Sequence, residues 1–289
     1  MLKRLGFHTV AFGGYLLLMT VALIGAGSLS YAILYASMLA SLALLTRNAI
    51  RTPTVRNETL AAAFYPIAIN VVFPAMKGAV PAIRSTRFDD MLFDVDTHLI
   101  GGSVSLRLER LVTPVLTDLM SFCYIFFMPL LFSNLLRYFI WDRGKRASFF
   151  TGLFTIYGVG FSGYVLVPAA GPYLAFPNLF PVQLTGSFIT NLNRAMVLAG
   201  SNHVDVFPSM HCAVSAYILG FAYRYHKREF WCLLLPVIGL WVSTLYLRYH
   251  YFIDVLCGFI LAAAGLMLAS AKATEEVRTF TNADCTQLR

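Results

Sequence analysis

Stretches of about twenty apolar residues recur along this chain, and each is long enough for a helix to cross the hydrocarbon core of a bilayer. Hydrophobic residues make up 58% of the sequence and charged residues 12%, with a mean hydropathy of +0.69. That charged share is about half of what a soluble domain carries. The sequence therefore predicts an integral membrane protein.

The spacing of the apolar stretches predicts an all-α, polytopic membrane helix bundle with about eight spans. The expected spans cover residues 7–24, 30–45, 59–76, 112–140, 149–167, 209–223, 230–247 and 251–271. Gly25-Ala26-Gly27 has the small-residue composition of a signal-peptide cleavage site. The length of the first run, and a second run directly after it, favour a retained first span instead.

The chain is interpreted as one membrane domain over residues 1–289, because no internal repeat and no Pro- or Ser-rich linker divides it. The N-terminal spans occupy residues 1–76. Residues 77–111 mix acidic, basic and apolar side chains, which predicts interfacial helices lying on the membrane. A catalytic core of residues 112–271 and a polar tail of residues 272–289 complete the predicted organisation.

The lysines and arginines predict which way the bundle faces, because cytoplasmic connections of membrane proteins carry most of these residues. If the N-terminus is cytoplasmic, fifteen of the 22 lysines and arginines fall on the cytoplasmic side. They lie in short clusters between apolar stretches, without the interleaved aromatics of a nucleic-acid site, so the net charge of +8 does not indicate a nucleic-acid partner. The expected partner is the bilayer and a lipid substrate, while the oligomeric state stays open.

Two polar stretches at the ends of apolar segments contain residue types that are typical of catalytic sites. In the second of them His250 and Asp254 stand four residues apart, so at the start of a helix they would share one face. A carboxylate that holds one imidazole nitrogen fixes the tautomer and leaves the other nitrogen free as a nucleophile or base. The ordinary alternative is a solvated histidine beside a helix-capping acid.

The first stretch, Phe207 to His211, places another histidine directly after Pro208-Ser209, a composition that starts helices. A helix N-terminus attracts anions such as phosphate. His211 would then stand beside the anion and could protonate a leaving oxygen. By charge counting, both histidines lie at the non-cytoplasmic ends of their helices, so the predicted site faces the periplasm, the cell exterior or an organelle lumen. The compact chain and its short loops favour a bacterial inner membrane.

Together the two stretches resemble the type 2 phosphatidic acid phosphatase superfamily, whose pattern is Pro-Ser-Gly-His, then Ser-Arg, five residues, His, three residues and Asp. Here the pattern runs from Pro208 to His211 and then from Ser243 to Asp254. The resemblance implies a six-helix core with N-terminal additions and a metal-free, cofactor-free phosphohistidine mechanism. In it His250 attacks phosphorus, Asp254 orients His250, and His211 protonates the departing alcohol.

The departures from the pattern bear on the substrate. Met210 and Thr244 stand where the phosphatases keep Gly and Arg, and no Lys/Arg-Pro element precedes Pro208. Fewer cations suit a phosphodiester monoanion better than a phosphomonoester that is close to a dianion. The chain is similar in this respect to the inositol phosphorylceramide synthase and sphingomyelin synthase branch, which implies transfer of a phospho-head group from a lipid diester to a hydroxyl acceptor.

Several further residues are candidates for binding phosphate or substrate, each with an ordinary alternative. Arg248 and Arg194 are the remaining cations near the motifs. The ordinary alternative for each is an arginine whose side chain extends to the membrane–water interface. Asp118 is an ionisable group inside a predicted span. The other candidates are Tyr173, Ser209 and Ser243.

Two other functions compete with head-group transfer. A lipid phosphate phosphatase would use the same histidines and let water attack the phosphohistidine. A lipid transporter or lipid-binding protein would line a pathway with them, but transporters usually carry repeated halves or broken helices at the midplane, and this sequence has neither. No spacing of Cys, His, Asp or Glu indicates a metal site.

Overall fold

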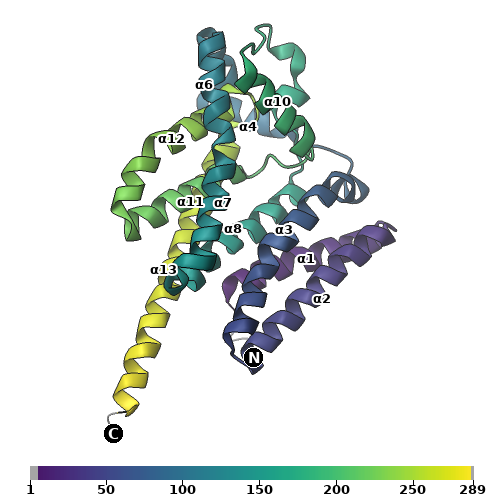
Figure 1. Cartoon of the computed structure of the whole chain (residues 1–289). Coiled ribbons are helices and arrows are strands. Elements are labelled where there is room, and N and C mark those ends of the chain that lie inside the picture. Colours follow the sequence, from purple (N-terminus) through teal and green to yellow (C-terminus); the bar gives the residue numbers. More distant parts are fainter. Residues whose placement is uncertain (1–5, 288–289) are drawn as a thin grey trace.

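The computed structural model describes the backbone of residues 6–287 and the side chains up to residue 275, and every regular element in that part of the chain is helical (Figure 1). The longer helices are α1 (Phe7–Gly25), α2 (Leu29–Arg51), α3 (Val55–Ile83), α6 (Pro114–Ile125), α7 (Phe127–Leu136), α8 (Arg146–Leu166), α11 (Met210–Tyr225), α12 (Lys227–Tyr246) and α13 (Phe252–Gln287). The others are α4 (Asp89–Ile100), α5 (Val104–Leu108), α9 (Pro172–Ala175), α10 (Phe188–Gly200) and the short turns η2 (Glu109–Leu111), η3 (Arg137–Trp141), η4 (Arg143–Lys145) and η5 (Pro177–Leu179). The predicted all-α membrane bundle is confirmed.

Seven helical segments in the described part are long and apolar enough to cross a membrane, one fewer than the eight expected. The difference is α11, which has 16 residues and therefore reaches only about 24 Å. Most of its side chains are buried inside the bundle. An apolar stretch of that length is as typical of a core helix as of a span, so the sequence alone could not separate the two.

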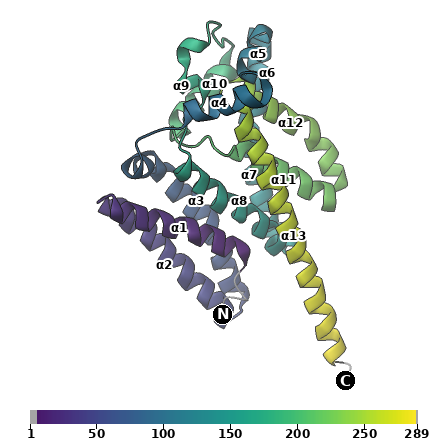
Figure 2. The ribbon, with the colours of Figure 1, turned by 180° about the vertical axis from the view of Figure 1, so that it is seen from behind.

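Helix α8 forms the centre of the bundle. It packs against α1, α13 and α11, and most of its side chains are buried on all sides. A helix that is apolar around its whole circumference is typical of a fully enclosed position. The hairpin of α1 and α2 covers one flank of α8, and α13 crosses the other (Figure 2).

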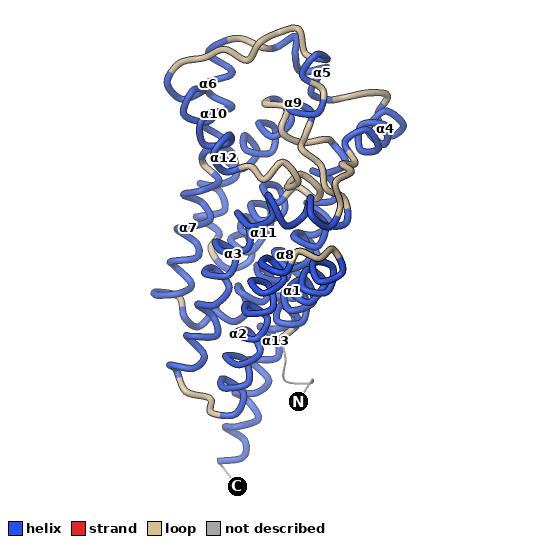
Figure 3. The backbone as a smooth tube through the Cα atoms, turned by 90° about the vertical axis from the view of Figure 1, so that its right-hand side faces the viewer, coloured by secondary structure: helices blue, strands red, loops and turns tan. Residues whose placement is uncertain are grey.

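The ends of the bundle differ. Helices α4, α5, α9 and α10 gather at one end with most of the non-helical connections, whereas the two chain termini lie at the other (Figures 1 and 3). Helix α3 continues to Ile83 in spite of three internal prolines, and so includes the first residues of 77–111, for which the sequence predicts interfacial helices. The predicted polar tail continues α13 as far as Gln287, and residues 288–289 lie outside the described part.

Candidate active site

The first motif begins helix α11 at the end of the bundle that carries α4 and α10. Ser209 is the N-cap of α11, and its hydroxyl accepts a hydrogen bond from the Cys212 amide at 3.4 Å. Capping by serine satisfies one of the amides that a helix start leaves free. His211 is therefore held on the first turn of the helix, as the Pro-Ser sequence predicts.

The second motif forms a tight connection between α12 and α13. The amides of Tyr249 and His250 both donate to the carbonyl oxygen of Thr244, at 3.0 and 3.1 Å. Arg248 takes a left-handed conformation, with φ of 66°, which turns the chain within this connection. Thr244 thus contributes its backbone carbonyl to the loop, while its side chain is fully buried against the carbonyl of Trp241.

The imidazole of His250 lies against the carboxylate of Asp254. Nδ1 of His250 is 3.4 Å from Oδ2 of Asp254, and both residues are almost completely buried. The same Oδ2 accepts the Tyr251 amide at 2.9 Å, whereas Oδ1 of Asp254 has no hydrogen-bond partner. Helix α13 begins at Phe252, two residues after His250, so the loop and not a shared helix face brings these two side chains together.

Backbone contacts join the two motifs to each other. The Ser209 amide donates to the carbonyl oxygen of Asp254 at 3.0 Å. Gly258 lies one turn further along α13 and faces the start of α11. A Cβ atom at this position would stand 2.6 Å from the Ser209 carbonyl oxygen. Only a residue without a side chain allows α13 to approach the start of α11 this closely.

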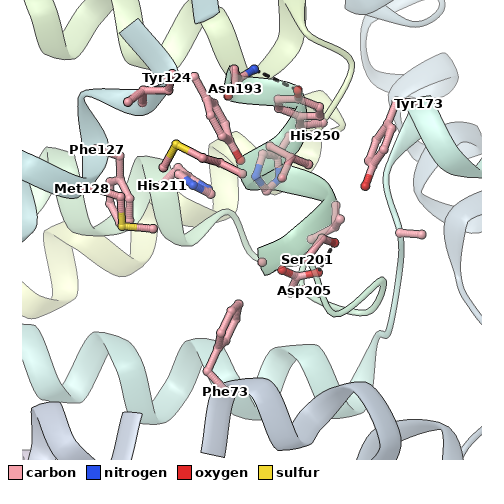
Figure 4. A pocket seen from close by; sticks show the side chains of 17 residues that line it. Phe73, Tyr124, Phe127, Met128, Tyr173, Asn193, Ser201, Asp205, His211 and His250 are labelled. Atoms are coloured by element: carbon pink, nitrogen blue, oxygen red, sulfur yellow. Dashed lines mark hydrogen bonds between the residues drawn. The ribbon is translucent and has the colours of Figure 1, made fainter. Parts of the chain in front are cut away.

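Both histidines line one cavity of about 160 Å³ (Figure 4). Their ring centroids are 5.7 Å apart, and the His211 ring also contacts those of Tyr124 and Phe127, each with a centroid distance of 4.6 Å. Among the described residues that line this cavity, none is a lysine or an arginine. Its charged or titratable groups are the two imidazoles, three tyrosines and one carboxylate, Asp205.

Asp205 is a site residue that sequence reasoning missed. Its Oδ1 accepts hydrogen bonds from the Ser201 hydroxyl at 3.1 Å and the Asn202 amide at 3.2 Å, and burial raises the pKa of its carboxyl group. Burial also lowers the pKa of His250 from 6.5 to about 4, although the nearby charge of Asp205 opposes that shift. The only hint in the sequence was the position of Asp205 in the connection that leads into Phe207, and a single aspartate in a connection rarely indicates a site.

Three residues that line the cavity have a buried polar atom without a hydrogen-bond partner: Tyr173, Asn193 and His250, whose Nδ1 has only the 3.4 Å ion-pair contact with Asp254. The hydroxyl of Tyr173 and Oδ1 of Asn193 are buried without a hydrogen bond, and the Asn193 side-chain amide donates to the Tyr249 hydroxyl at 2.9 Å. Buried polar atoms are usually paired, so unpaired ones in a cavity indicate groups that a ligand would satisfy. Tyr173 was a candidate from sequence, whereas nothing in the sequence distinguished Asn193.

Tyr173 reaches the cavity because of the glycine two residues before it. Gly171 has φ of 89°, a conformation that side chains disfavour, and a Cβ atom there would stand 2.3 Å from the Tyr249 carbonyl oxygen. The Tyr173 amide donates to the Arg248 carbonyl at 2.9 Å. The loop before α9 is thereby fastened to the His250 connection.

The two candidate arginines do not line the histidine cavity. They line a neighbouring one of about 310 Å³ that shares Tyr173 and Tyr249 with it. Arg248 donates to Glu109 Oε1 at 3.1 Å and to the Val182 carbonyl at 2.7 Å. Arg194 is exposed and donates to the Leu184 carbonyl at 2.9 Å. In this arrangement both guanidinium groups hold the loop between α9 and α10.

The remaining candidates have structural contacts. Ser243 is buried, with its hydroxyl donating to the Leu240 carbonyl at 2.7 Å. Asp118 accepts the amides of Ser187 and Thr190 at the start of α10 and lies outside the catalytic cavity. These contacts account for both side chains without a ligand.

Helix α4 supports the site through two buried carboxylates. Asp96 accepts the amides of Phe252 and Ile253, at 2.7 and 2.9 Å, and so caps α13 from a different helix. Asp89 accepts the Gly171 amide at 3.0 Å and the Tyr251 hydroxyl at 2.9 Å. The interfacial segment, in which the sequence shows no motif, thus fixes both loops that carry site residues.

Comparison with protein families gives a match over residues 90–268, more than half of the chain, to the PAP2 superfamily. The chain belongs to the PAP2 superfamily. The resemblance seen in the motifs is thereby confirmed, and the matched region contains His211, His250, Asp254 and all of α4 except its first residue. Among the described residues, no group of three or more His, Cys, Asp or Glu side chains could hold a metal ion.

A curated relative lies on the branch that the sequence departures indicated. The chain is 30% identical over 168 residues to a phosphoinositol dihydroceramide synthase of Bacteroides thetaiotaomicron, an alignment that covers 53% of this chain and 54% of the relative. The chain therefore spans about half the length of that protein. No solved structure matches the chain.

Proposed function

We propose that this protein is a lipid phosphotransferase that moves a phospho-head group from a lipid phosphodiester to a hydroxyl acceptor. The observation that carries the proposal is the cavity shared by His211 and His250, with a buried carboxylate on the far nitrogen of His250. This arrangement places a nucleophile and a proton donor at one phosphoryl group.

In the first step, Nε2 of His250 attacks phosphorus with its lone pair. The bond from phosphorus to the lipid alcohol breaks, and His211 gives a proton to the departing oxygen. The carboxylate of Asp254, which lies 3.4 Å from Nδ1 of His250, stabilises the positive charge that develops on the ring. The products of this step are a neutral lipid alcohol and a phosphodiester-like group bound to His250.

In the second step, the hydroxyl of the acceptor loses its proton to His211 while its oxygen attacks phosphorus. The bond between phosphorus and Nε2 breaks, and the lone pair returns to His250. His211 then carries the proton needed for the next cycle. Atoms and charge balance over the two steps, and no other reactant enters.

The charges of the cavity support a diester substrate. Without lysine or arginine in the wall, and with Asp205 close to His250, a dianionic phosphomonoester would meet one carboxylate and no compensating cation. A diester carries a single negative charge, so its transfer from water into this cavity costs less electrostatic free energy. The name of the bacterial relative, a phosphoinositol dihydroceramide synthase, agrees with transfer between lipids.

Hydrolysis of a lipid phosphomonoester is the second candidate, because the same two histidines serve phosphatases of the superfamily. The deciding experiment incubates purified protein with a fluorescent ceramide and phosphatidylinositol in one reaction, and with phosphatidic acid alone in another. Transfer predicts a fluorescent inositol-bearing lipid in the first reaction, and hydrolysis of a phosphomonoester predicts inorganic phosphate in the second. His250→Ala should abolish either reaction, and unchanged turnover in that variant would disprove the mechanism.

A further inference from the structure

A second cavity lies at the opposite end of the bundle from the histidines, near the chain termini. It has a volume of about 400 Å³, larger than the catalytic cavity, and opens between α1, α2, α3, α8 and α13. Its wall contains the first turn of α1, the first turns of α8 and Lys272 from the far half of α13. The catalytic mechanism uses none of these residues.

Two helix N-termini meet at this cavity. Gly6, His8 and Thr9 line it from the start of α1, and Arg146 and Ala147 from the start of α8. Neither helix start has a side-chain cap. The free amides and the partial positive charge of a helix N-terminus favour an anion. Both helices, of 19 and 21 residues, are long enough to carry a full terminal charge.

Buried polar atoms without partners provide an independent observation. The hydroxyl of Thr151 has no hydrogen bond although the residue is only 4% exposed, and Nδ1 of His8 is also buried without one. Both residues line the cavity. Unpaired buried groups are costly unless a ligand satisfies them. A hydroxyl and a ring nitrogen facing one cavity can both donate to the oxygens of an anion.

The side chains around the cavity carry net positive charge. Arg146 and Lys272 line it together with one carboxylate, the exposed Glu58. Arg146 also donates to the Thr59 hydroxyl at 3.4 Å, and Lys272 donates to Glu275 at 2.9 Å. Both cations are partly exposed, so a head-group phosphate could reach them without entering the apolar core.

An apolar groove continues from the cavity between α1 and α2. It has a volume of about 210 Å³, shares Thr9, Thr46 and Ile50 with the cavity, and is lined mainly by apolar atoms. Arg47 and Arg51 stand at its edge. A cationic cavity joined to an apolar groove matches a molecule with an anionic head and a hydrocarbon chain better than it matches a free ion.

We infer that this cavity binds an anionic phospholipid, with its phosphodiester between Arg146, Lys272 and the N-termini of α1 and α8, and one acyl chain in the groove between α1 and α2. Basic pockets between membrane helices are known to hold anionic lipid head groups on the side where basic residues gather. The inference does not depend on the proposed transferase activity, because the two cavities share no residue.

The test measures binding to purified, delipidated full-length protein in neutral detergent, by native mass spectrometry and by thermal unfolding. Phosphatidylglycerol should bind at one site and raise the unfolding temperature, while phosphatidylcholine and inorganic phosphate should do so far less. Arg146→Gln should weaken phosphatidylglycerol binding about tenfold, since a charge-assisted hydrogen bond is lost. The control Arg143→Gln, an exposed arginine in the same basic turn outside the cavity, should bind as the wild type does.

A second variant keeps the test decisive if Arg146→Gln folds poorly. Thr151→Val removes only the unpaired hydroxyl, so the lipid-free protein should be at least as stable as the wild type while its affinity for phosphatidylglycerol falls. The inference would be overturned by equal binding of phosphatidylcholine, by equal stabilisation with phosphate alone, which would indicate an ion and no lipid, or by wild-type affinity in Thr151→Val. His250→Ala should bind phosphatidylglycerol normally, which separates this result from the fate of the transferase proposal.

Discussion

The backbone amide of Ser209 donates to the backbone carbonyl of Asp254 across 3.0 Å, so the residue that caps α11 is joined to the residue of α13 whose carboxylate lies beside His250. Because the contact is made by backbone atoms, it depends on how closely α11 and α13 approach. The separation of His211 and His250 is therefore set by helix packing.

Gly258 provides a direct test of this relationship. A methyl group at this position would stand 2.6 Å from the Ser209 carbonyl oxygen, so Gly258→Ala must push α13 away from the start of α11. We expect a loss of about 1–3 kcal/mol in unfolding free energy and at least a tenfold loss of transfer activity, roughly what misplacement of reacting groups costs. Gly14→Ala, in the interior of α1 where no atom lies within 4 Å, is the matched control and should leave activity unchanged while unfolding free energy stays equal or rises by up to about 1 kcal/mol.

The activity should persist into mildly acidic solution. Burial lowers the pKa of His250 to about 4, so the neutral imidazole that acts as nucleophile is retained where an exposed histidine, with its usual pKa near 6.5, would be protonated. The groups facing His250 are Asp205, Asp254 and His211. A rate profile in which His250 limits activity with an apparent pKa near 6.5 would contradict this prediction.

Folding stability should depend on pH in the same window. Between pH 6.5 and about 4, the unfolded chain binds a proton at His250 that the folded protein does not. Stability therefore falls as the pH is lowered through this range. The dependence should be weaker in His250→Gln, when thermal unfolding of the two proteins is compared at pH 7 and pH 5.

Asp205 should matter through its charge. Asp205→Asn keeps an acceptor for the Ser201 hydroxyl and the Asn202 amide but removes the negative charge near His250. We expect kcat to fall by about tenfold to a hundredfold, because the cationic phosphohistidine loses a stabilising charge, and the pKa of His250 to fall further. Asp142→Asn, a carboxylate at the other end of the bundle, is the control. Unchanged kcat in Asp205→Asn would remove this residue from the mechanism.

Helix α4 should act as a support for the site. Asp96→Ala removes the acceptor for the amides of Phe252 and Ile253 and should reduce stability by about 1–2 kcal/mol, as the loss of a helix cap does. Activity should fall with it, because α13 carries Asp254. Asp94→Ala, an exposed neighbour on the same helix, should have neither effect.

The orientation of the site in the membrane can be tested by labelling. In a variant whose native cysteines are replaced, Gln183→Cys in the loop before α10 should react with an impermeant maleimide added to intact cells. Arg143→Cys at the opposite end should react only after the cells are opened. The reverse pattern would contradict the proposal, based on the distribution of lysine and arginine, that the histidines face away from the cytoplasm.

Much of the membrane fold could be predicted because the bilayer imposes one length on every span. The pairing of His250 with Asp254 was also predictable, since residues four apart near a helix start stay close even though the helix begins only after His250. The helix start at His211 followed from Ser209, whose preference for caps is local. In each case the physical cause acts within a few residues of the chain.

The other parts of the site depend on contacts between distant segments. Arg248 was a natural candidate for phosphate, but Glu109, far earlier in the chain, draws its guanidinium into the neighbouring cavity. Asp205 and Asn193 reach the histidines only because the long connection folds back over them, and Asp96 because α4 lies across the start of α13. No local pattern in a single sequence carries that information.

The single imidazole of His211 has a consequence for the order of the proposed reaction. In the proposed mechanism His211, which lines the cavity together with His250, serves both the departing and the arriving alcohol. The two alcohols therefore occupy the same position in turn. The lipid alcohol of the donor must therefore leave before the acceptor enters, and the proposed enzyme follows a ping-pong mechanism. Its covalent intermediate persists until a second reactant arrives, and a lipid hydroxyl and water compete to react with it.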